Sequence, residues 1–564
     1  MSGDTLTYDM SSAPEGQASI FLRKDYLSLL DSNNGSYVSN NIIFETSSIA
    51  NSNRFCAWRD SYLLVPLLIT MTSGAAFQPA TADTSADYVV GLKNHYGTII
   101  SSYSLDYNGA NIVQQTPFIA LYNNFKLLTT LSYQDCISQG ASIGFWPDSA
   151  ESTGYTQDYS TSGSGVTNNR NGFASALVTG AFAQAGSVFN EGMQKRQSFW
   201  NFDPEAIMPG SELAYSRLMT TNSLTLVWKS YIFNKTNGAN GIPGVWQANI
   251  MACIYLRHFS SFFASVPLLK GVFFRLSLFV NQPSVNFTIA EDQYSACTVN
   301  SPLGGISPLM LASMAAGNGA NTLATGNYIV NLSVGQLCLN PAQSNLRGVA
   351  PGRLARNCQL IVPSYVMNPV FESAYLSSEI KKISFEGTYN FNVSNIAAGA
   401  TFTNLLTNGI SNQKSLLIVP FYTAADNGAA ALLPIQSPFS SAGGGTTSPF
   451  AYLGNFQAQV SGANVLYNQN QYLSTFFLQQ FYGTNAVNAG LTDGLTSGLI
   501  SKAAWETSYT YWYLDTSRML PCEEAIPKSV QITGQNLSTK PLDLYCFITF
   551  GQEISVSVLS GARV

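Results

Sequence analysis

Hydrophobic and polar positions alternate along much of the chain, most clearly in the stretch 382–422. From Ile383 to Val393, apolar and aromatic side chains hold one side of a period-two pattern, and Ser, Glu, Thr and Asn hold the other. This period predicts a β-strand with one buried face. Leu416 to Val419 form a continuous apolar run closed by Pro420, which predicts a strand buried on both faces.

Between these two strands the period changes. Phe402, Leu405 and Leu406 have the i, i+3, i+4 spacing of a short helix that packs by one face. Gly409 then lies where a left-handed C-terminal cap would end such a helix. The stretch is therefore predicted to read strand, helix, strand.

A similar order of periods occurs about 280 residues earlier. Alternation over 103–107 leads to an Asn108-Gly109 turn, and apolar residues at helical spacing follow over 118–128. Ile143 and Phe145 then predict a second strand before Pro147. The two segments share the order of hydrophobic periods but not the identity of their residues.

Short strands, few long helices and long loops predict an all-β chain of two tandem jelly-roll or sandwich domains with short helices. We expect an N-terminal arm at 1–40 and a first jelly roll at 41–296, with a long surface loop at 148–194. A connector at 297–345 and a second jelly roll at 346–564, with a loop at 426–448, complete the chain.

The charge content is unusually low for a chain of 564 residues. Asp, Glu, Lys and Arg make up 10% of it, against about 25% in ordinary soluble proteins. Because isolated proteins normally carry more charge to stay apart, we expect partners to cover much of this surface. The net charge of -5 and the lack of long basic runs disfavour direct sequence-specific nucleic-acid binding.

Compartment and membrane signals point to an intracellular origin. The eight cysteines are dispersed without a CxxC motif, which predicts buried free thiols in a reducing compartment. The N-terminus lacks a basic-then-apolar signal, so secretion is not expected, and the six Asn-x-Ser/Thr sites should stay unglycosylated. The apolar stretches 62–77 and 261–280 contain proline or charged residues, so buried strands, not transmembrane segments, are predicted.

Catalytic motifs are weak. Residues 140–144 match GxSxG, but a helical pattern precedes the serine and a strand pattern follows, which is the reverse of a nucleophile elbow. His95 lies in a polar turn, and His258 lies among aromatics as a packed imidazole; neither has a second histidine at metal-ligand spacing. No catalytic, cofactor-binding or metal-binding residue is therefore predicted.

Acidic and aromatic clusters leave two alternatives. Adjacent acids at 291–292 and 523–524 point to opposite faces of a strand, so they do not form the facing pair of a glycosidase. A carboxylate pair assembled from distant loops stays open. The aromatics of 509–514 (YTYWYL) would suit sugar stacking, although such clusters more often fill a core or an interface.

Several segments of the second half carry a family resemblance: PSYVMNPVFESAYLSSEIKKISFEGTYNFNVSN, FTNLLTNGISNQKSLLIVPFY, NFQAQVSGANVLYNQNQY, and LDTSRMLPCEEAIPKSVQITGQNLS through to EISVSVLSGARV. In the first half it rests on NSNRFCAWRDSYLLVPLLI and LYNNFKLLTTLSYQD. The chain thus resembles the double jelly-roll major capsid proteins of polinton-like viruses and virophages.

The resemblance implies a structural virion protein without enzymatic activity or cofactor. Its expected partners are copies of itself, as a homotrimer of pseudo-hexagonal outline and then as trimer-trimer contacts in an icosahedral capsid, together with penton and minor capsid proteins. Its expected location is the virion, assembled inside the infected host cell. The alternative is a carbohydrate-binding or carbohydrate-active jelly-roll protein. A third hypothesis is a membrane-active or adhesive protein, but the sequence lacks the secretory signal that such a protein would need.

Overall fold

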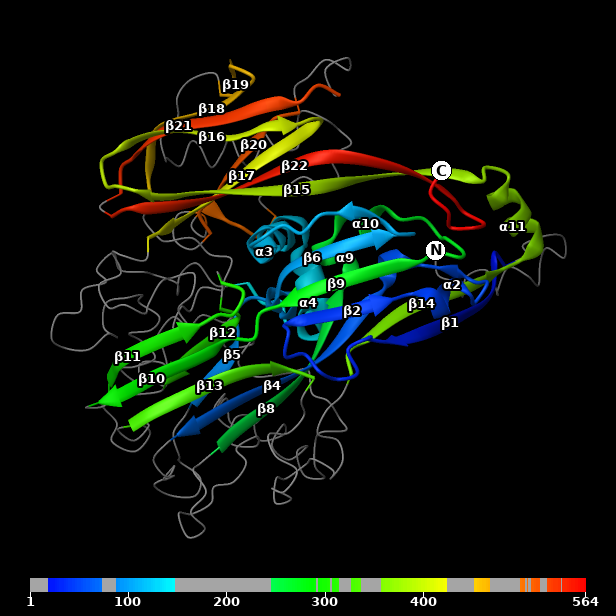
Figure 1. Ribbon diagram of the computed structural model, residues 1–564, viewed down its shortest axis with the longest axis horizontal. Coiled ribbons are helices and arrows are strands. Elements are labelled where there is room, and N and C mark those ends of the chain that lie inside the picture. The colour runs from blue at the N-terminus through cyan, green and yellow to red at the C-terminus, as the bar shows by residue number, and fades with distance from the viewer. Residues whose placement is uncertain are drawn as a thin grey trace, which may run out of the picture.

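Most of the regular structure consists of strands, which pack as two β-sandwiches with helices between them (Figure 1). The computed structural model describes residues 19–73, 88–147, 245–290, 293–304, 307–313, 326–335, 357–423, 451–466, 498–502, 505, 509–517, 525–538 and 540–564. The predicted loops 148–194 and 426–448 lie outside these residues.

The second sandwich consists of two four-stranded antiparallel sheets, β15-β22-β17-β20 and β16-β21-β18-β19. Numbered one to eight along the chain, the strands stand in the orders 1-8-3-6 and 2-7-4-5, which is the jelly-roll arrangement. The strands are β15 (Ile380–Ile396), β16 (Thr401–Ile410), β17 (Gln413–Tyr422), β18 (Leu453–Val460), β19 (Ala463–Asn464), β20 (Trp512–Asp515), β21 (Lys528–Asn536) and β22 (Leu542–Ser557).

The first sandwich repeats this order. β1 and β4 flank β14, β8 pairs with the other edge of β4, and the facing sheet is β2-β9-β6-β7, so the orders are again 1-8-3-6 and 2-7-4-5. The strands are β1 (Phe21–Leu30), β2 (Asn41–Glu45), β4 (Tyr62–Ser73), β6 (Ile100–Tyr107), β7 (Ala110–Val113), β8 (Val245–Tyr255), β9 (Phe274–Val280) and β14 (Gln359–Met367). The two halves of the chain are therefore two jelly rolls.

Further described elements extend the first sandwich. Strands β13, β10 and β11 extend the sheet beyond β4, β12 pairs with β5, and β3 pairs with β14. Their bounds are β3 (Phe55–Cys56), β5 (Tyr88–Leu92), β10 (Ser284–Ala290), β11 (Gln293–Asn300), β12 (Leu309–Ser313) and β13 (Gly326–Val334). The helices are α2 (Ser47–Ala50), η1 (Trp58–Asp60), η2 (Tyr96–Ile99), α3 (Ile119–Thr130), α4 (Tyr133–Ile143), α9 (Leu256–Phe259), α10 (Ser261–Ser265) and α11 (Pro369–Leu376).

Several local predictions are confirmed. Asn108 and Gly109 both have positive φ, +47° and +83°, as a two-residue hairpin turn between β6 and β7 requires. The helical spacing over 118–128 corresponds to α3, and the run Leu416–Val419 is fully buried within β17. β4 occupies most of the apolar stretch 62–77, whereas the stretch 261–280 is strand only over β9 and begins with helix α10. In the described part of the chain no helix is long and apolar enough to cross a membrane.

The helix predicted at 402–406 is wrong, because this segment is strand β16. Phe402 and Leu406 are buried while Leu405 is half exposed. Positions i and i+4 share a face in a strand as well as in a helix, so this spacing does not distinguish the two. Gly409 accordingly lies inside the strand and caps no helix.

The strand predicted at 143–145 is also wrong, since helix α4 occupies residues up to Ile143. Ser132 and Asp135 form a reciprocal capping box at its start, and Gly144 ends it with a φ of +68°. The two predicted strand-helix-strand units therefore differ: the first is strand, strand, helix, helix and the second is strand, strand, strand.

Strand pairing also places elements outside the expected boundaries. β1 lies within the predicted arm 1–40, and β12 and β13 lie within the predicted connector 297–345. β14, expected in the second jelly roll that would start at 346, pairs instead with β1 and β4. The eighth strand of a jelly roll must return beside the first, so the pairing partner, which local sequence does not reveal, assigns it to the first sandwich.

Asn536 tests the second sandwich. Its buried amide donates to the carbonyl oxygens of Ile396 and Lys540, both at 2.9 Å, and accepts from the Ser538 N–H at 2.8 Å. We expect Asn536→Leu to lower the free energy of unfolding by about 2–3 kcal/mol, because these groups lose their partner without access to water. Urea unfolding followed by tryptophan fluorescence measures this. Asn464→Leu, at an exposed position, is the control, and equal effects of the two changes would contradict the prediction.

Candidate assembly surfaces

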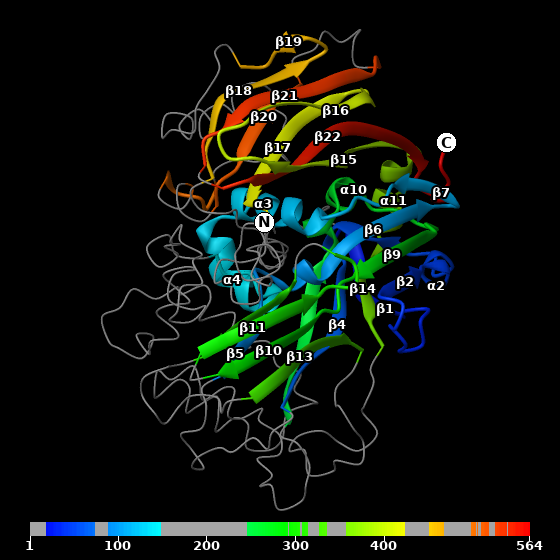
Figure 2. The ribbon, with the colours of Figure 1, turned by 60° about the vertical axis from the view of Figure 1, so that its left-hand side comes forward.

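Helix α3 lies between the two sandwiches (Figure 2) and is buried on nearly all sides. On one side it contacts α9, η2 and β6 of the first sandwich. On the other it meets the outer face of the sheet β15-β22-β17-β20 through three aromatic pairs. These are Phe118 with Tyr545, Tyr122 with Phe547 and Phe125 with Tyr511, with ring centroids 5.3, 5.9 and 5.2 Å apart. We call this contact the seam.

The first residue of the seam is held in a costly backbone conformation. Phe118 precedes α3 with a φ of +57°, which is unfavourable for a bulky side chain by about 1–3 kcal/mol. Its ring packs edge-on against Tyr545. The seam contact therefore offsets the strain and fixes where the helix begins.

Polar groups close the exposed edge of β15. This strand lies at the edge of its sheet, and edge strands present unpaired backbone groups. The Ser261 hydroxyl accepts from the Glu386 N–H at 2.8 Å, and the Thr116 hydroxyl donates to the Thr388 carbonyl at 2.7 Å. Side chains of the first sandwich thus satisfy the edge of the second.

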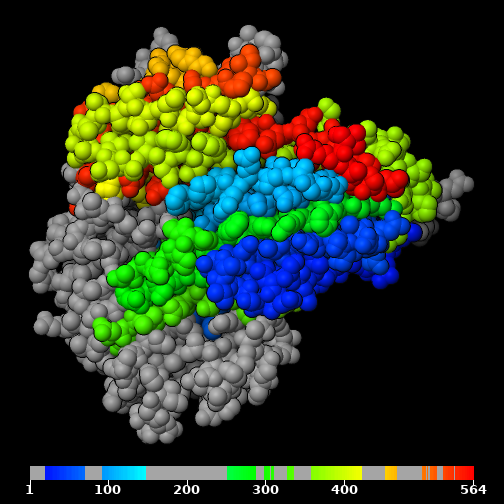
Figure 3. All heavy atoms as spheres, in the orientation of Figure 1, coloured from blue at the N-terminus to red at the C-terminus, as the bar shows by residue number. Residues whose placement is uncertain are grey.

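A C-terminal hook, residues 557–564, adds a second tie between the sandwiches. The Gly561 carbonyl accepts from the Tyr107 hydroxyl at 2.5 Å and from the Asn108 amide at 2.8 Å. Gly561 has a φ of +64°, and a Cβ there would lie 2.7 Å from the Lys270 carbonyl oxygen. Figure 3 shows the two sandwiches in continuous contact along this face.

The equivalent outer face of the first sandwich is open in part, because Tyr62 and Leu64 are half-buried whereas Pro66 and Leu68 farther along β4 are buried. Leu63 and Val65 of β4 point into the core, whereas Tyr62 and Leu64 point outward. With residues of β1, β8 and α4 they line a groove of about 480 Å³. Its residues are Tyr26, Tyr62, Leu64, Ser142, Met251, Cys253 and Tyr255. Apart from Ser142 the lining is aromatic or apolar, and we call it the outer groove.

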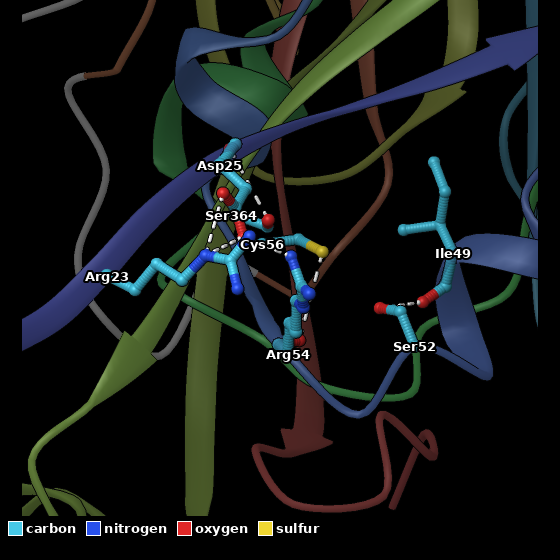
Figure 4. A network of polar contacts seen from close by, with 7 residues as sticks. All are labelled: Arg23, Asp25, Ile49, Ser52, Arg54, Cys56 and Ser364. Carbon is cyan, nitrogen blue, oxygen red and sulfur yellow. Dashed lines mark hydrogen bonds and ion pairs between the residues drawn. The ribbon is translucent and has the colours of Figure 1, made fainter.

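Ion pairs fix the strand that borders the outer groove. Asp25, next to Tyr26 on β1, pairs with Arg23 and with Arg54 from the segment before β3, and its carbonyl accepts from the Ser364 hydroxyl of β14 at 3.3 Å (Figure 4). The partly exposed ion pairs contribute about 1 kcal/mol or less each. The Arg54 ion pair and the Ser364 hydrogen bond tie β1 to neighbouring segments, whereas the Arg23 pair lies within β1. Tyr26, next to Asp25, has 60% of its surface exposed.

The residues with candidate chemistry are not brought together. Ser142 of the GxSxG match lies in the last turn of α4 and no helix follows it directly, so the elbow geometry is missing. Glu291, Asp292, Glu523 and Glu524 lie outside the described residues. Among the residues whose placement is described, no three His, Cys, Asp or Glu side chains gather as a metal site would need.

The aromatic cluster at 509–514 serves packing. Tyr511 lies in the seam, and Trp512 stacks on Phe456 of the facing sheet with ring centroids 5.0 Å apart. Tyr509 and Tyr513 are buried as well. The core alternative is therefore confirmed, and these rings offer no platform for a sugar.

His95, predicted in a polar turn, is buried, and His258 is half-buried. The His95 Nδ1 accepts from the Gly97 N–H at 3.0 Å, and its Nε2 is buried without a hydrogen-bond partner. Burial, and next the charge of His258, lower the pKa of His95 to about 3. Burial, and next Arg257 and Lys126, lower the pKa of His258 to about 4.

The predicted free thiols are confirmed for the described cysteines. Cys56, Cys136, Cys253, Cys358 and Cys546 are unpaired, and all but Cys253 are buried. Burial raises the pKa of the Cys253 thiol to about 11, which leaves little thiolate at neutral pH. The four buried cysteines are therefore packing residues, and Cys253 lines the outer groove as a thiol that is largely protonated at neutral pH.

Sequence reasoning missed both the seam and the outer groove. A signal for the groove was present: the segment CAWRDSYLLVPLLITM is apolar at successive positions, so both faces of the strand had to be covered. The core covers one face in this chain, and the other lines the groove.

Phe547 tests the seam. It is fully buried against Tyr122, and we expect Phe547→Ala to cost about 3–5 kcal/mol, as for other large buried aromatics. Urea unfolding and limited proteolysis between the sandwiches measure the loss. Tyr389→Ala, at a position 41% exposed on the neighbouring strand, should cost less than about 1 kcal/mol; a similar cost for both would argue against the seam.

The histidines predict acid sensitivity. The unfolded chain binds their protons below about pH 6.5, whereas the folded chain binds them only near pH 4 and pH 3. Stability is therefore fully present above pH 6.5 and falls as the pH drops toward 4, by up to about 1.4 kcal/mol per pH unit for each histidine. His95→Asn with His258→Gln should flatten this slope in urea unfolding between pH 6.5 and pH 5. If the free energy of unfolding fell with pH as steeply in the double variant as in the native protein, the histidines would not be the cause of the acid sensitivity.

The sequence and the structure were compared with those of known proteins. No protein-family model matches the chain, and no curated protein matches it. It is similar to a chain in the cryo-EM structure of the Sputnik virophage, with 12% identity, a TM-score of 0.48 and coverage of 97% of this chain and 89% of that one. It is also similar to the mavirus major capsid protein, with 8% identity, a TM-score of 0.42 and coverage of 97% of this chain and 91% of that one. The Faustovirus major capsid protein is similar at 10% identity, with a TM-score of 0.43 and coverage of 96% of this chain and 92% of that one.

Proposed function

We propose that this chain is the building block of a viral shell: a non-enzymatic major capsid protein that forms homotrimers and then an icosahedral capsid. The observation that carries the proposal is the repeated strand order, 1-8-3-6 and 2-7-4-5, in two sandwiches joined by one seam. The Faustovirus and mavirus proteins bear this role in their names. For this chain the support comes from its own architecture and surfaces.

The duplication suits a closed shell. Three copies of a two-sandwich chain place six similar domains around a threefold axis, so the block has a nearly hexagonal outline. Such a block meets six neighbours although it has only threefold symmetry. Penton and minor capsid proteins would complete the shell at positions where this block does not fit, and the assembled virion is the proposed location.

The low charge supports extensive self-contact. Only 10% of the residues are charged, and the outer groove contains none of them. Burying an unpaired charge in an interface costs several kcal/mol, so weakly charged faces associate without that penalty. The carbohydrate alternative is not favoured, because the aromatic cluster at 509–514 is buried.

Size-exclusion chromatography with light scattering, followed by negative-stain imaging, tests the proposal. We expect a species of three times the 60.8 kDa chain mass, with threefold particles or shells in the images. Because apolar contacts dominate, raising the salt from about 0.05 to 0.5 M should leave the trimer intact. A monomer at all accessible concentrations would contradict the proposal.

A further inference from the structure

The seam and the outer groove lie on equivalent faces of the two jelly rolls. In the second sandwich, the outer face of the 1-8-3-6 sheet is covered by α3 through Tyr545, Phe547 and Tyr511. In the first sandwich, the outer face of the 1-8-3-6 sheet carries the outer groove, with Tyr26 on the first strand, Tyr62 on the third and Tyr255 on the sixth. One face is occupied, and part of its counterpart forms an open groove.

The covering element also has a counterpart. Helix α3 lies between the fifth and sixth strands of the first sandwich, β7 and β8. The same interval in the second sandwich, between β19 and β20, contains residues 467–497. Their sequence includes QYLSTFFLQQFY, with Leu473, Phe476, Phe477 and Phe481 at i, i+3, i+4 and i+8, a spacing typical of one helix face.

Residues 467–492 and the outer groove have similar side-chain composition. Residues 467–492 contain no charged side chain and are rich in aromatics. The outer groove is likewise uncharged and aromatic. In the seam, rings on α3 meet rings of the sheet, so the chain already contains one example of this kind of contact.

We propose that the outer groove is the docking site for residues 467–497 of a second copy of this chain. The inference rests on the self-association proposed above and names the contact that produces it. Within one chain, the first sandwich covers the second through α3; between chains, the second sandwich covers the first through 467–497. The contact is head-to-tail, and head-to-tail contacts close into rings when the rotation permits.

Cross-linking tests this contact in the full chain. Tyr26→Cys places a thiol at the rim of the outer groove, where the side chain is 60% exposed, and Ser474→Cys places one in the segment. With a short bismaleimide, the double variant should give covalent species of two and three chains in a denaturing gel. Each single variant controls for native cysteines, and Leu405→Cys with Ser474→Cys, at a position 51% exposed on β16, is the matched control.

The outcomes separate the two proposals. Intermolecular links in the double variant, confirmed by mass spectrometry of the joined peptides and at least tenfold above the controls, support the docking site. If light scattering shows trimers but the link is missing or joins residues of one chain, the docking site is overturned and the shell function stands. If the protein is monomeric throughout, both are overturned.

Discussion

The packing of helices of the first sandwich against a sheet of the second holds the two sandwiches together. The buried apolar residues form a single cluster that continues through both sandwiches. Helices α3 and α10 join its two parts, α3 through the seam and α10 through the contact of Phe262 with Phe385 of β15. A helix buried on all sides would be unstable in isolation, because it needs apolar partners around its circumference. The burial of α3 between the two β-sandwiches therefore helps to make them one unit.

The seam also solves a problem inherent in β-sandwiches. Each sheet ends in an edge strand that would pair with any available chain. Ser261 and Thr116 satisfy backbone groups of β15, and ion pairs through Asp25 hold β1 in place. Uncontrolled edge pairing is thereby restrained, and apolar faces are left for specific association.

Duplication with divergence explains why the two faces differ. The strand orders are the same, but among the described strands, β10 to β13 are additions to the first sandwich, between its seventh and eighth jelly-roll strands. One 1-8-3-6 sheet is completed within the chain and the other offers the outer groove. A chain that covered both faces itself would gain little free energy from association. A chain with one covered face and one groove can gain free energy by binding a second copy in one orientation.

Local sequence was sufficient for the class of fold and for many elements. Alternation marked β15 and β6, the Asn108-Gly109 pair marked a hairpin, and the apolar run at 416–419 marked a central strand, because burial on one or two faces leaves a direct trace in residue order. It did not distinguish a strand from a helix at 402–406, since both periods place i and i+4 on one face. Only the tertiary structure decided that β1 and β14 are the first and last strands of one jelly roll, that His95 is buried, and that α3 belongs to two cores at once. Those facts depend on which residues meet across hundreds of positions of chain, and no local pattern records them.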